Sequence, residues 1–463
     1  MPASHPHVLL FICDQMQAPR PAIAQTAQTP ALDALAAEGV RFTHAYCANA
    51  QCVPSRVSLQ TGLYPHEAEV MIIYGFHGHT AHLDGTHLTS GQVFRDAGYT
   101  TAYFGKTHFG TTLEQLGYDV GSDRRAPGLN SAVDEEYVRA ARAFLAEYDP
   151  RRPLFLTVSV NQPHPPFEFI PQFVSQYPVE RMRLPESFYR DDLSTKPAFQ
   201  RTHALDGHHG TENEATLRTE IAQYCTMISN VDRLFAEVQQ ALEVRGMWEE
   251  TVVLFTSDHG DMMGSHRTRL KGTLPYEELY NVPLILRLPG GPRGRVVGDL
   301  VVQTAVPGTL VEAAGLSLPD AFRGGSLLSR LQRLEPPQEE YVFFEHYGAY
   351  WGLHPFRAVR RREASGDWKY VKYYGPDATE ELYDLVADPL ELVNRAQDEG
   401  YRSVRTELER VVDGWWQQTG GRDFAYYESH EFKQRGAATL VVSGRTRPAT
   451  GTMAIDAHRS HDA

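Results

Sequence analysis

The stretch Val8-Leu-Leu-Phe-Ile-Cys-Asp-Gln15 decides the fold class. Its six apolar residues, from Val8 to Cys13, follow one another without a polar break, which predicts a strand covered on both faces. Segments rich in β-branched and aromatic residues predict further central strands at Thr100–Phe104, Leu154–Val160 and Val252–Thr256. Helical segments alternate with these strands, and the longest, Leu217–Arg245, keeps its apolar residues at helical spacing. This alternation predicts an α/β protein with a mainly parallel central sheet.

The chain changes character near Leu334-Glu-Pro-Pro-Gln338, a composition typical of a linker. Beyond it, short antiparallel strands are predicted at Tyr341–Phe344, Phe356–Val359 and Trp368–Tyr373. We therefore expect a large α/β domain over residues 1–335, a smaller C-terminal subdomain with an antiparallel sheet over 336–446, and a polar tail over 447–463. Residues 171–212 are polar, contain prolines and show weak periodicity, which predicts a long, structureless excursion over the sheet.

The composition narrows the classes of partner. The 463 residues carry a formal net charge of −14, which argues against nucleic acid or an anionic membrane as the main partner. No apolar run reaches the 18 residues of a transmembrane helix, and the N-terminus lacks the pattern of a signal peptide, so we expect a cytoplasmic protein. Four cysteines are too few for a disulfide framework and match no zinc site, so Cys13 and Cys225 are interpreted as small buried apolar residues.

Polar residues gather where four predicted central strands end. The strands run into Asp14-Gln15, Gly105-Lys-Thr-His108, Asn161-Gln-Pro-His164 and Ser257-Asp-His-Gly-Asp261. Ligands of open α/β sheets bind beyond the carboxyl ends of the strands, so these distant segments are expected to build one site. A single acid at a strand end is often only a helix cap, but four polar ends together favour a site.

Three of these residues, Asp14, Asp258 and His259, suit a divalent cation, and Gln15 offers an amide oxygen as a further ligand. An oxygen-rich site favours Ca²⁺, Mg²⁺ or Mn²⁺, and an imidazole shifts the preference toward Mn²⁺ or a later metal. The alternative interpretation is that Asp258 is a turn residue and His259 a core histidine.

Cys52-Val-Pro-Ser-Arg56 is the rarest string in the chain. Pro54 fits the first turn of a short helix that Gly62 would end. Cys52 would then lie at a helix N-terminus, where backbone N–H groups favour a bound anion, with Arg56 one turn further on. A reactive thiolate at Cys52 is one chemical interpretation. Lys271 is either a surface lysine or a further cation of the same site.

These motifs resemble those of type I sulfatases of the alkaline phosphatase superfamily, from the first strand to the C-terminal subdomain. The family signature is matched by Cys52-Val-Pro-Ser-Arg56 with Thr61-Gly62, the second motif by Gly105–His108, and the second metal-binding segment by Ser257–Asp261. The resemblance implies an α/β/α sandwich with a small antiparallel sheet packed against a helix. It also implies a partner, the formylglycine-generating enzyme that oxidises the signature cysteine to formylglycine.

The resemblance gives the site residues their roles. Formylglycine at position 52, hydrated and bound to one divalent metal (Ca²⁺ or Mn²⁺), attacks the sulfur of a small-molecule sulfate ester and forms a covalent intermediate. The implied metal ligands are Asp14, Gln15, Cys52, Asp258 and His259, with Asp258 helping to deprotonate the attacking oxygen. The other catalytic residues implied are Arg56, Lys106 and Lys271 for the sulfuryl oxygens, His164 (with Lys271) for the departing alcohol and His108 for the release of sulfate.

Two positions depart from the common pattern. Gln15 stands where many sulfatases have a second Asp, and His259 where Asn is common, which resembles the branch of choline sulfatases and phosphonate monoester hydrolases. The main alternative activity is therefore a phosphonate monoester or phosphodiester hydrolase with the same nucleophile. Lys106 and His108 favour sulfate esters, because those hydrolases carry hydroxyl-bearing residues there. A non-catalytic descendant would have lost site residues that are intact in this chain.

The alcohol part of the substrate stays open between a small-molecule sulfate ester, an aryl sulfate and a sugar sulfate. The histidines at positions 66, 77, 79, 82 and 87 are either solvated loop residues or part of the substrate pocket. The aromatic cluster Tyr347, Tyr350, Trp351 and His354 could stack on a ring or cradle a quaternary ammonium, or serve ordinary packing. The predicted substrate contacts are His77, Tyr350 and Trp351. The aromatic cluster and the polar tail could also serve a homo-oligomer.

Overall fold

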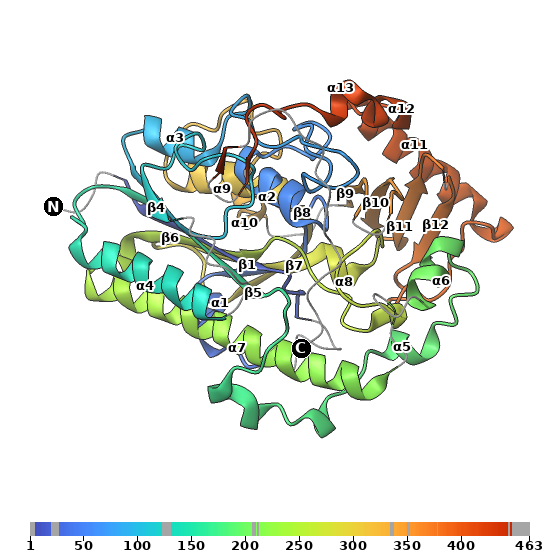
Figure 1. Ribbon diagram of the computed structural model, residues 1–463, viewed down its shortest axis with the longest axis horizontal. Helices are drawn as coiled ribbons and strands as arrows, with labels where there is room; N and C mark the ends of the chain where they lie inside the picture. Colours follow the sequence, from blue (N-terminus) through green and yellow to red (C-terminus); the bar gives the residue numbers. More distant parts are fainter. Residues whose placement is uncertain are drawn as a thin grey trace.

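A computed structural model describes residues 5–19, 27–122, 131–205, 210, 213–333, 338–349, 352–376, 378–442 and 445–446. Its large sheet has eight strands in the order β4-β3-β5-β1-β6-β7-β2-β8 (Figure 1). These are β1 (His7–Asp14), β2 (Val40–Tyr46), β3 (Thr100–Gly105), β4 (Val120–Ser122), β5 (Leu154–Pro163), β6 (Thr251–Ser257), β7 (Asn281–Arg287) and β8 (Arg295–Val302). Neighbouring strands are parallel, except that β7 is antiparallel to β6 and β2. The predicted, mainly parallel sheet is confirmed.

Helices cover both faces of this sheet (Figure 1). One face carries α1 (Pro30–Glu38), α4 (Ser131–Glu147) and α7 (Glu214–Val244), and the other carries α2 (Cys52–Thr61), α3 (Ser90–Asp96), α9 (Val306–Ala313) and α10 (Leu328–Leu331). Successive residues of β1 enter the two cores in turn: Phe11 packs with the first set of helices and Leu10 with the second. Because both faces are buried, β1 needs an unbroken apolar run. The α/β/α sandwich is confirmed.

A second, antiparallel sheet has the strand order β12-β11-β10-β9. Its strands are β9 (Glu339–His346), β10 (Phe356–Glu363), β11 (Gly366–Tyr373) and β12 (Glu380–Asp384). One face packs against α11 (Arg402–Gln418), where Tyr370 meets Val412 in one core. The other face shares a core with the large sheet, where Phe344 tilts against Tyr280 at 4.4 Å between ring centroids. The small sheet is therefore fixed to the large one by apolar packing.

The remaining short elements are α8 (Glu277–Tyr280), α12 (Phe424–Glu428), α13 (His430–Lys433) and the pair β13 (Val441–Val442) and β14 (Arg445–Thr446). The expected domain boundary near residue 335 falls on residues 334–337, outside the described residues, so the division into 1–335 and 336–446 stays a prediction. The expected polar tail at 447–463 also lies outside them. Within the described ranges, no helix combines the length and apolarity needed to cross a bilayer.

The expectation of a structureless excursion over residues 171–212 is wrong for the residues that the structure describes. They form 3₁₀ helices at Pro171–Gln176 and Val179–Arg181, followed by α5 (Glu186–Arg190) and α6 (Ala198–Leu205). The segment also reaches the small sheet, where Gln200 Nε2 donates to Glu381 Oε1 at 2.7 Å. The two 3₁₀ helices bury none of their residues, α5 buries two and α6 three, so they leave no periodic pattern in the sequence.

His346, at the end of β9, is a fully buried imidazole. Its ring stacks on Phe356 with 5.7 Å between centroids, and among the described groups neither ring nitrogen has a hydrogen-bond partner. Burial, and to a lesser degree His354, lowers the pKa of His346 to about 3. The folded pKa thus lies below the unfolded value of about 6.5, so the unfolded chain takes up a proton that the folded chain refuses.

Acidification is therefore expected to destabilise the protein through His346. The stabilisation is complete above pH 6.5 and is lost as the pH falls toward 3, with a loss of about 2 kcal/mol already at pH 5. His346→Phe keeps the stacked ring and removes the titration, so its melting temperature relative to wild type should rise as the pH is lowered from 7.5 to 5. Scanning calorimetry of both proteins in matched buffers measures this difference. Parallel losses of melting temperature would contradict the prediction.

Candidate active site

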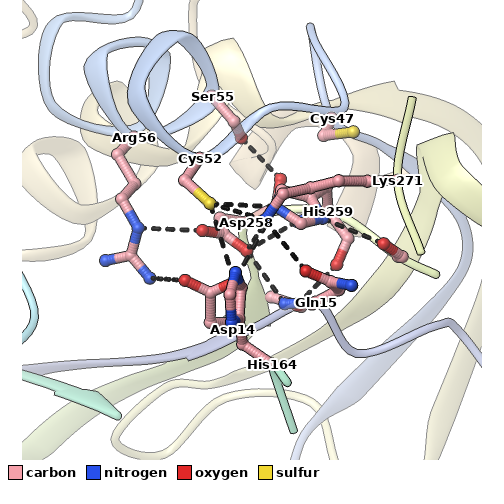
Figure 2. A network of polar contacts seen from close by, with 12 residues as sticks. Asp14, Gln15, Cys47, Cys52, Ser55, Arg56, His164, Asp258, His259 and Lys271 are labelled. Atoms are coloured by element: carbon pink, nitrogen blue, oxygen red, sulfur yellow. Dashed lines mark hydrogen bonds and ion pairs between the residues drawn. The ribbon is translucent and has the colours of Figure 1, made fainter. Parts of the chain in front are cut away.

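The predicted strand ends that carry Asp14, His164 and Asp258 converge at one edge of the large sheet (Figure 2). β1 pairs in parallel with both β5 and β6, with Asp14 beside Pro163 and Cys13 beside Ser257. β3 continues the edge on the far side of β5. The N-terminus of α2 lies over the same edge and starts with Cys52, while Gly62 ends this helix in the left-handed region at φ 69°. The predicted convergence of these segments is thus what the fold builds.

Asp14, Cys52, Asp258 and His259 form a buried group that could hold a metal ion. One potential ligand atom from each lies within 4.8 Å of the others. His259 Nδ1 is 2.9 Å from the Gly260 carbonyl oxygen, so Nδ1 carries a proton and Nε2 faces the group. Two carboxylates and one correctly oriented imidazole fit a divalent cation.

The pKa values of the Asp14 and Asp258 carboxyls are shifted in opposite directions. Burial and Cys52 raise the pKa of Asp14, but the basic side chains of Lys106, His164 and Lys271 outweigh them and hold it below its usual range. Burial raises the pKa of Asp258, and the neighbouring Asp14 raises it further. Asp14 is therefore ionised, and a nearby cation would stabilise the ionised form of Asp258.

Arg56 binds the two carboxylates. Its Nε donates to Asp258 Oδ2 at 2.8 Å and its Nη2 to Asp14 Oδ2 at 3.2 Å. Its Nη1 donates to Ser159 Oγ at 2.8 Å and to the Lys106 carbonyl oxygen at 3.1 Å. A guanidinium has five N–H donors, so at most one remains for a substrate oxygen. In this structure Arg56 therefore holds the two carboxylates in place, and its contact with a sulfuryl oxygen stays a prediction.

Two lysine ammonium groups lie close to the Cys52 sulfur. Lys271 Nζ lies 2.9 Å from Sγ and Lys106 Nζ lies 3.6 Å from it. Lys106 also forms an ion pair with Asp14. Burial raises the pKa of the Cys52 thiol, but Lys106, Lys271, His259 and a hydrogen bond with His108 together hold it well below its ordinary value. The pocket thus favours negative charge at this atom.

His164 and His108 both reach Cys52. His164 Nδ1 is 2.6 Å from the Pro165 carbonyl oxygen, and its ring hydrogen-bonds with Cys52. Burial and Lys271 lower the pKa of His164, so the imidazole is neutral in the absence of substrate. His108 has a left-handed backbone at φ 56° just after β3, which allows Lys106 and His108, two residues apart, to face the same point.

Gln15 lies beside this group. Its Oε1 accepts from Lys271 Nζ at 2.9 Å and its Nε2 donates to Asp261. The amide oxygen of Gln15, which was predicted to bind the metal, therefore lies on the side of the amide that faces Lys271.

Sequence reasoning missed several residues that hold the site together. Tyr103 donates to the Lys106 carbonyl at 2.5 Å, and Ser55 donates to the Asp258 carbonyl at 2.5 Å. Asp134, on α4, accepts from the backbone N–H groups of Asn161 and Gln162 at 2.7 and 2.9 Å and so fixes the segment before His164. Ser55 could have been found from its place within the signature. No motif in the sequence near Asp134 predicts its contact with Asn161 and Gln162.

The predicted substrate contacts receive less support. Tyr350 and Trp351 lie outside the described residues. His77 is exposed and binds the Ala349 carbonyl oxygen at 2.6 Å, while the nearby Tyr74 ring meets His108 edge-on at 5.6 Å. This loop therefore lies beside the site, with His77 fastening it to the turn after β9.

Other residues of the histidine stretch (residues 66–87) and of the aromatic cluster (residues 347–354) serve packing. Tyr347 is buried in the core under α11, and His354 stacks on Phe199 at 4.1 Å. The interpretation as solvated loop histidines is wrong for His66, His79 and His82, which are at most 5% exposed. His66 shows the reason, because its ring and its backbone N–H both bind the buried carboxylate of Glu345.

Comparison with known proteins agrees with this geometry. Residues 6–316 match the family described as Sulfatase, and residues 265–418 match the family described as N-sulphoglucosamine sulphohydrolase, C-terminal. An arylsulfatase of Clostridium perfringens is 26% identical over 92% of this chain and 97% of its own length. The Delta 4,5-hexuronate-2-O-sulfatase of Bacteroides thetaiotaomicron is 28% identical over 89% of this chain and 88% of its own length.

Solved structures share the fold. A protein solved in complex with its substrate D-glucosamine-2-N,6-O-disulfate has a TM-score of 0.77 at 20% identity, covering 90% of this chain and 98% of that one. The phosphonate monoester hydrolase of Agrobacterium radiobacter has a TM-score of 0.72 at 23% identity, covering 91% and 97%. The Sulfatase family alone spans well over half of the chain. The protein therefore belongs to the type I sulfatases of the alkaline phosphatase superfamily, which are sulfuric ester hydrolases.

Proposed function

We propose that this protein hydrolyses the sulfate monoester of a small molecule, with Cys52 oxidised to formylglycine as the nucleophile and a covalent sulfo-enzyme intermediate. The observation that carries the proposal is the environment of Cys52. It is the first residue of α2, it belongs to a buried group fit for a metal, and two lysine ammonium groups lie within 3.6 Å of its sulfur. Such a pocket stabilises the negative charge that a sulfuryl group develops during transfer.

The chain supplies the remaining groups of the reaction. Lys106 and Lys271 would bind sulfuryl oxygens, and Arg56 would hold Asp14 and Asp258 in place. A divalent cation bound by Asp14, Gln15, Asp258 and His259 would supply Lewis-acid stabilisation of negative charge at residue 52. We prefer Mn²⁺ to Ca²⁺, because one ligand is an imidazole.

Two histidines would move protons. His164 would donate to the departing alcohol oxygen, which needs a protonated imidazole. Burial and Lys271 lower its pKa in the free protein, so the negative charge of the incoming sulfate must offset both effects. His108 would remove the proton of the second hydroxyl of the hydrated formylglycine. The C=O bond of the aldehyde then re-forms, the bond from that carbon to the sulfate ester oxygen breaks, and sulfate leaves.

Lys106 and His108 also bear on the choice between sulfate and phosphonate esters. Both face Cys52, which supports the sulfate reading over a phosphonate monoester or phosphodiester hydrolase. The named relatives act on aryl and on uronic acid sulfates, so esters of these two classes are the first to screen.

The proposal is tested first at Cys52. Protein made in a host with a formylglycine-generating enzyme is digested with trypsin, which releases Phe42–Arg56, a peptide that also contains Cys47. Conversion lowers its mass by about 18 Da, and fragmentation assigns the loss to Cys52 or Cys47. Rates with 4-nitrophenyl sulfate and 4-nitrophenyl phenylphosphonate, each with Mn²⁺ and Ca²⁺, follow. An unmodified Cys52 would end the formylglycine mechanism, and a preference for the phosphonate would reverse the choice of substrate.

Lys271→Ala is expected to lower kcat/KM for a sulfate ester by about 10²–10³-fold, the usual cost of losing one preorganised donor to a developing anion. Lys271 is only 6% exposed, so its ammonium acts where little water competes. Lys433→Ala, which removes a half-buried lysine paired with Glu428 at 2.7 Å, is the control and should keep the wild-type rate. Steady-state kinetics, corrected for the converted fraction of Cys52, decides. Equal rates for both variants would remove Lys271 from the site.

A further inference from the structure

The side-chain amide of Gln15 is held between two groups of opposite hydrogen-bonding character. Its Oε1 accepts from the Lys271 ammonium at 2.9 Å, and its Nε2 donates to the Asp261 carboxylate. An ammonium can only donate and an ionised carboxylate can only accept. The two neighbours therefore allow one orientation of the amide, with its oxygen toward Lys271 and its nitrogen toward Asp261.

The second carboxylate oxygen of Asp261 closes a loop. Asp261 Oδ1 accepts from the backbone N–H of Met263 at 2.8 Å and from that of Leu270 at 3.1 Å. These two residues begin and end the segment 263–270 that leads into Lys271. One side chain thus holds both ends of the loop that delivers the ammonium to Cys52.

This loop needs such a clamp, because much of its backbone is left-handed. Met263, His266, Arg267 and Leu270 have φ values of 42°, 52°, 59° and 62°, and Gly264 has 95°. Each non-glycine residue in that region costs about 1–3 kcal/mol, so the surroundings must hold the conformation. Strain of this kind gathers where a side chain has to be placed against the local preference of the chain.

Asp261 itself lies behind the site. It is completely buried and does not belong to the group of Asp14, Cys52, Asp258 and His259. Within the described ranges, no Lys, Arg or His comes within ion-pair distance of it, so its charge is met by N–H donors alone. Burying a carboxylate without an ion pair costs free energy of folding. A neutral side chain could hold the loop without this cost, so the loop alone does not explain an acid at position 261.

We propose that Asp261 is a positioning residue that fixes the Gln15 amide with its oxygen toward the metal group and, through the loop 263–270, places the Lys271 ammonium beside residue 52. The proposal rests on the proposed function for the roles of Gln15 and Lys271. It also explains why position 15 holds an amide, since a carboxylate there would face the carboxylate of Asp261. Residues 15 and 261 thus act as one donor–acceptor pair.

The test reverses the polarity of this pair. Asp261→Asn can still accept from Met263 and Leu270, but it turns an NH₂ group toward Gln15, so the amide must flip or separate. Gln15→Glu alone sets two carboxylates against each other. The double variant Gln15→Glu/Asp261→Asn restores one donor and one acceptor, and keeps an oxygen facing Lys271. Asp232→Asn is the matched control, because Asp232 is a buried carboxylate that accepts from the backbone N–H groups of Ala31 and Leu32 far from the site.

Three quantities are measured for each full-length protein: melting temperature, Mn²⁺ affinity from the free Mn²⁺ signal in electron paramagnetic resonance, and kcat/KM per converted Cys52. Each single variant should bind Mn²⁺ about 10–100-fold more weakly, the usual effect of losing a partner of a metal ligand, with a comparable loss of kcat/KM. The double variant should recover at least tenfold over Asp261→Asn in both. The Asp232→Asn control should match wild type in affinity and rate.

A double variant no better than its worse parent would overturn the proposal. So would an Asp261→Asn protein with a lower melting temperature but wild-type affinity and rate, which is the pattern of a purely structural clamp. If Asp261→Asn does not fold, Gln15→Glu and its rescue by the second substitution still decide. If wild type hydrolyses no sulfate ester, the proposed function fails by itself, and the Mn²⁺ affinities of wild type, the two single variants and the double variant still test the pair.

Discussion

Cys52→Ala is expected to lower kcat/KM for a sulfate ester by at least about 10⁴-fold, with the melting temperature close to that of wild type. The expected loss is large because the variant lacks the atom that forms the covalent intermediate, so only binding and charge stabilisation by Lys106 and Lys271 remain. The fold should persist, since a buried cysteine behaves as a small apolar residue and its exchange for Ala changes little volume. Cys52 is 1% exposed and stands at the first position of α2, where Ala fits the helix.

Cys47→Ala is the matched control. Cys47 is also fully buried and only five residues away. Its sulfur faces the carbonyl oxygen of Leu279, away from the possible metal ligands Asp14, Asp258 and His259. Burial raises the pKa of the Cys47 thiol, so this sulfur stays protonated and unreactive. The control should convert Cys52 and hydrolyse the ester as wild type does. If Cys52→Ala kept more than about one per cent of the wild-type rate, another residue would be the nucleophile.

The sequence predicted the scaffold of this site well, because parallel sheets simplify the problem. A strand covered on both faces must be apolar throughout, so β1 can be predicted from its own residues without knowledge of its neighbours. Its carboxyl end then has to meet the carboxyl ends of β3, β5 and β6, which brings Asp14, Lys106, His164 and Asp258 together. These four side chains needed only strand order and direction to be placed near one another.

Contacts that depend on side-chain direction were not predictable. The guanidinium of Arg56 fits between Asp14 and Asp258, a contact that its place one turn after Cys52 does not indicate. Asp134 comes from a helix on the other side of β5, and no spacing in the sequence links it to Asn161. Buried polar partners of this kind are set by three-dimensional fit, for which a single sequence carries no periodic signal.

Removal of divalent metal is expected to lower kcat/KM by about 10³-fold or more, and added Mn²⁺ should restore it better than Ca²⁺. The site loses the Lewis acid, and its two carboxylates lose the cation that both would face. Arg56 and Lys106 compensate part of that charge, so the apo protein should stay folded at a lower melting temperature. Dialysis against a chelator, followed by titration with each metal under calorimetry and activity assay, measures both effects.

The gain in melting temperature on adding metal should also grow from pH 5 to pH 7.5. In the metal-free protein burial and Asp14 raise the pKa of Asp258 above its ordinary value, so a proton competes with the cation at the lower pH. The folded apo state therefore loses stability as the pH rises through that raised pKa, and metal binding recovers it. Asp258→Asn removes this titration together with one metal ligand, so it should lower the gain and weaken its pH dependence, while Asp232→Asn should leave both unchanged. A metal-induced gain that is constant over this range in wild type would mean that Asp258 is ionised throughout, and that Arg56 alone already supplies the charge the pair requires.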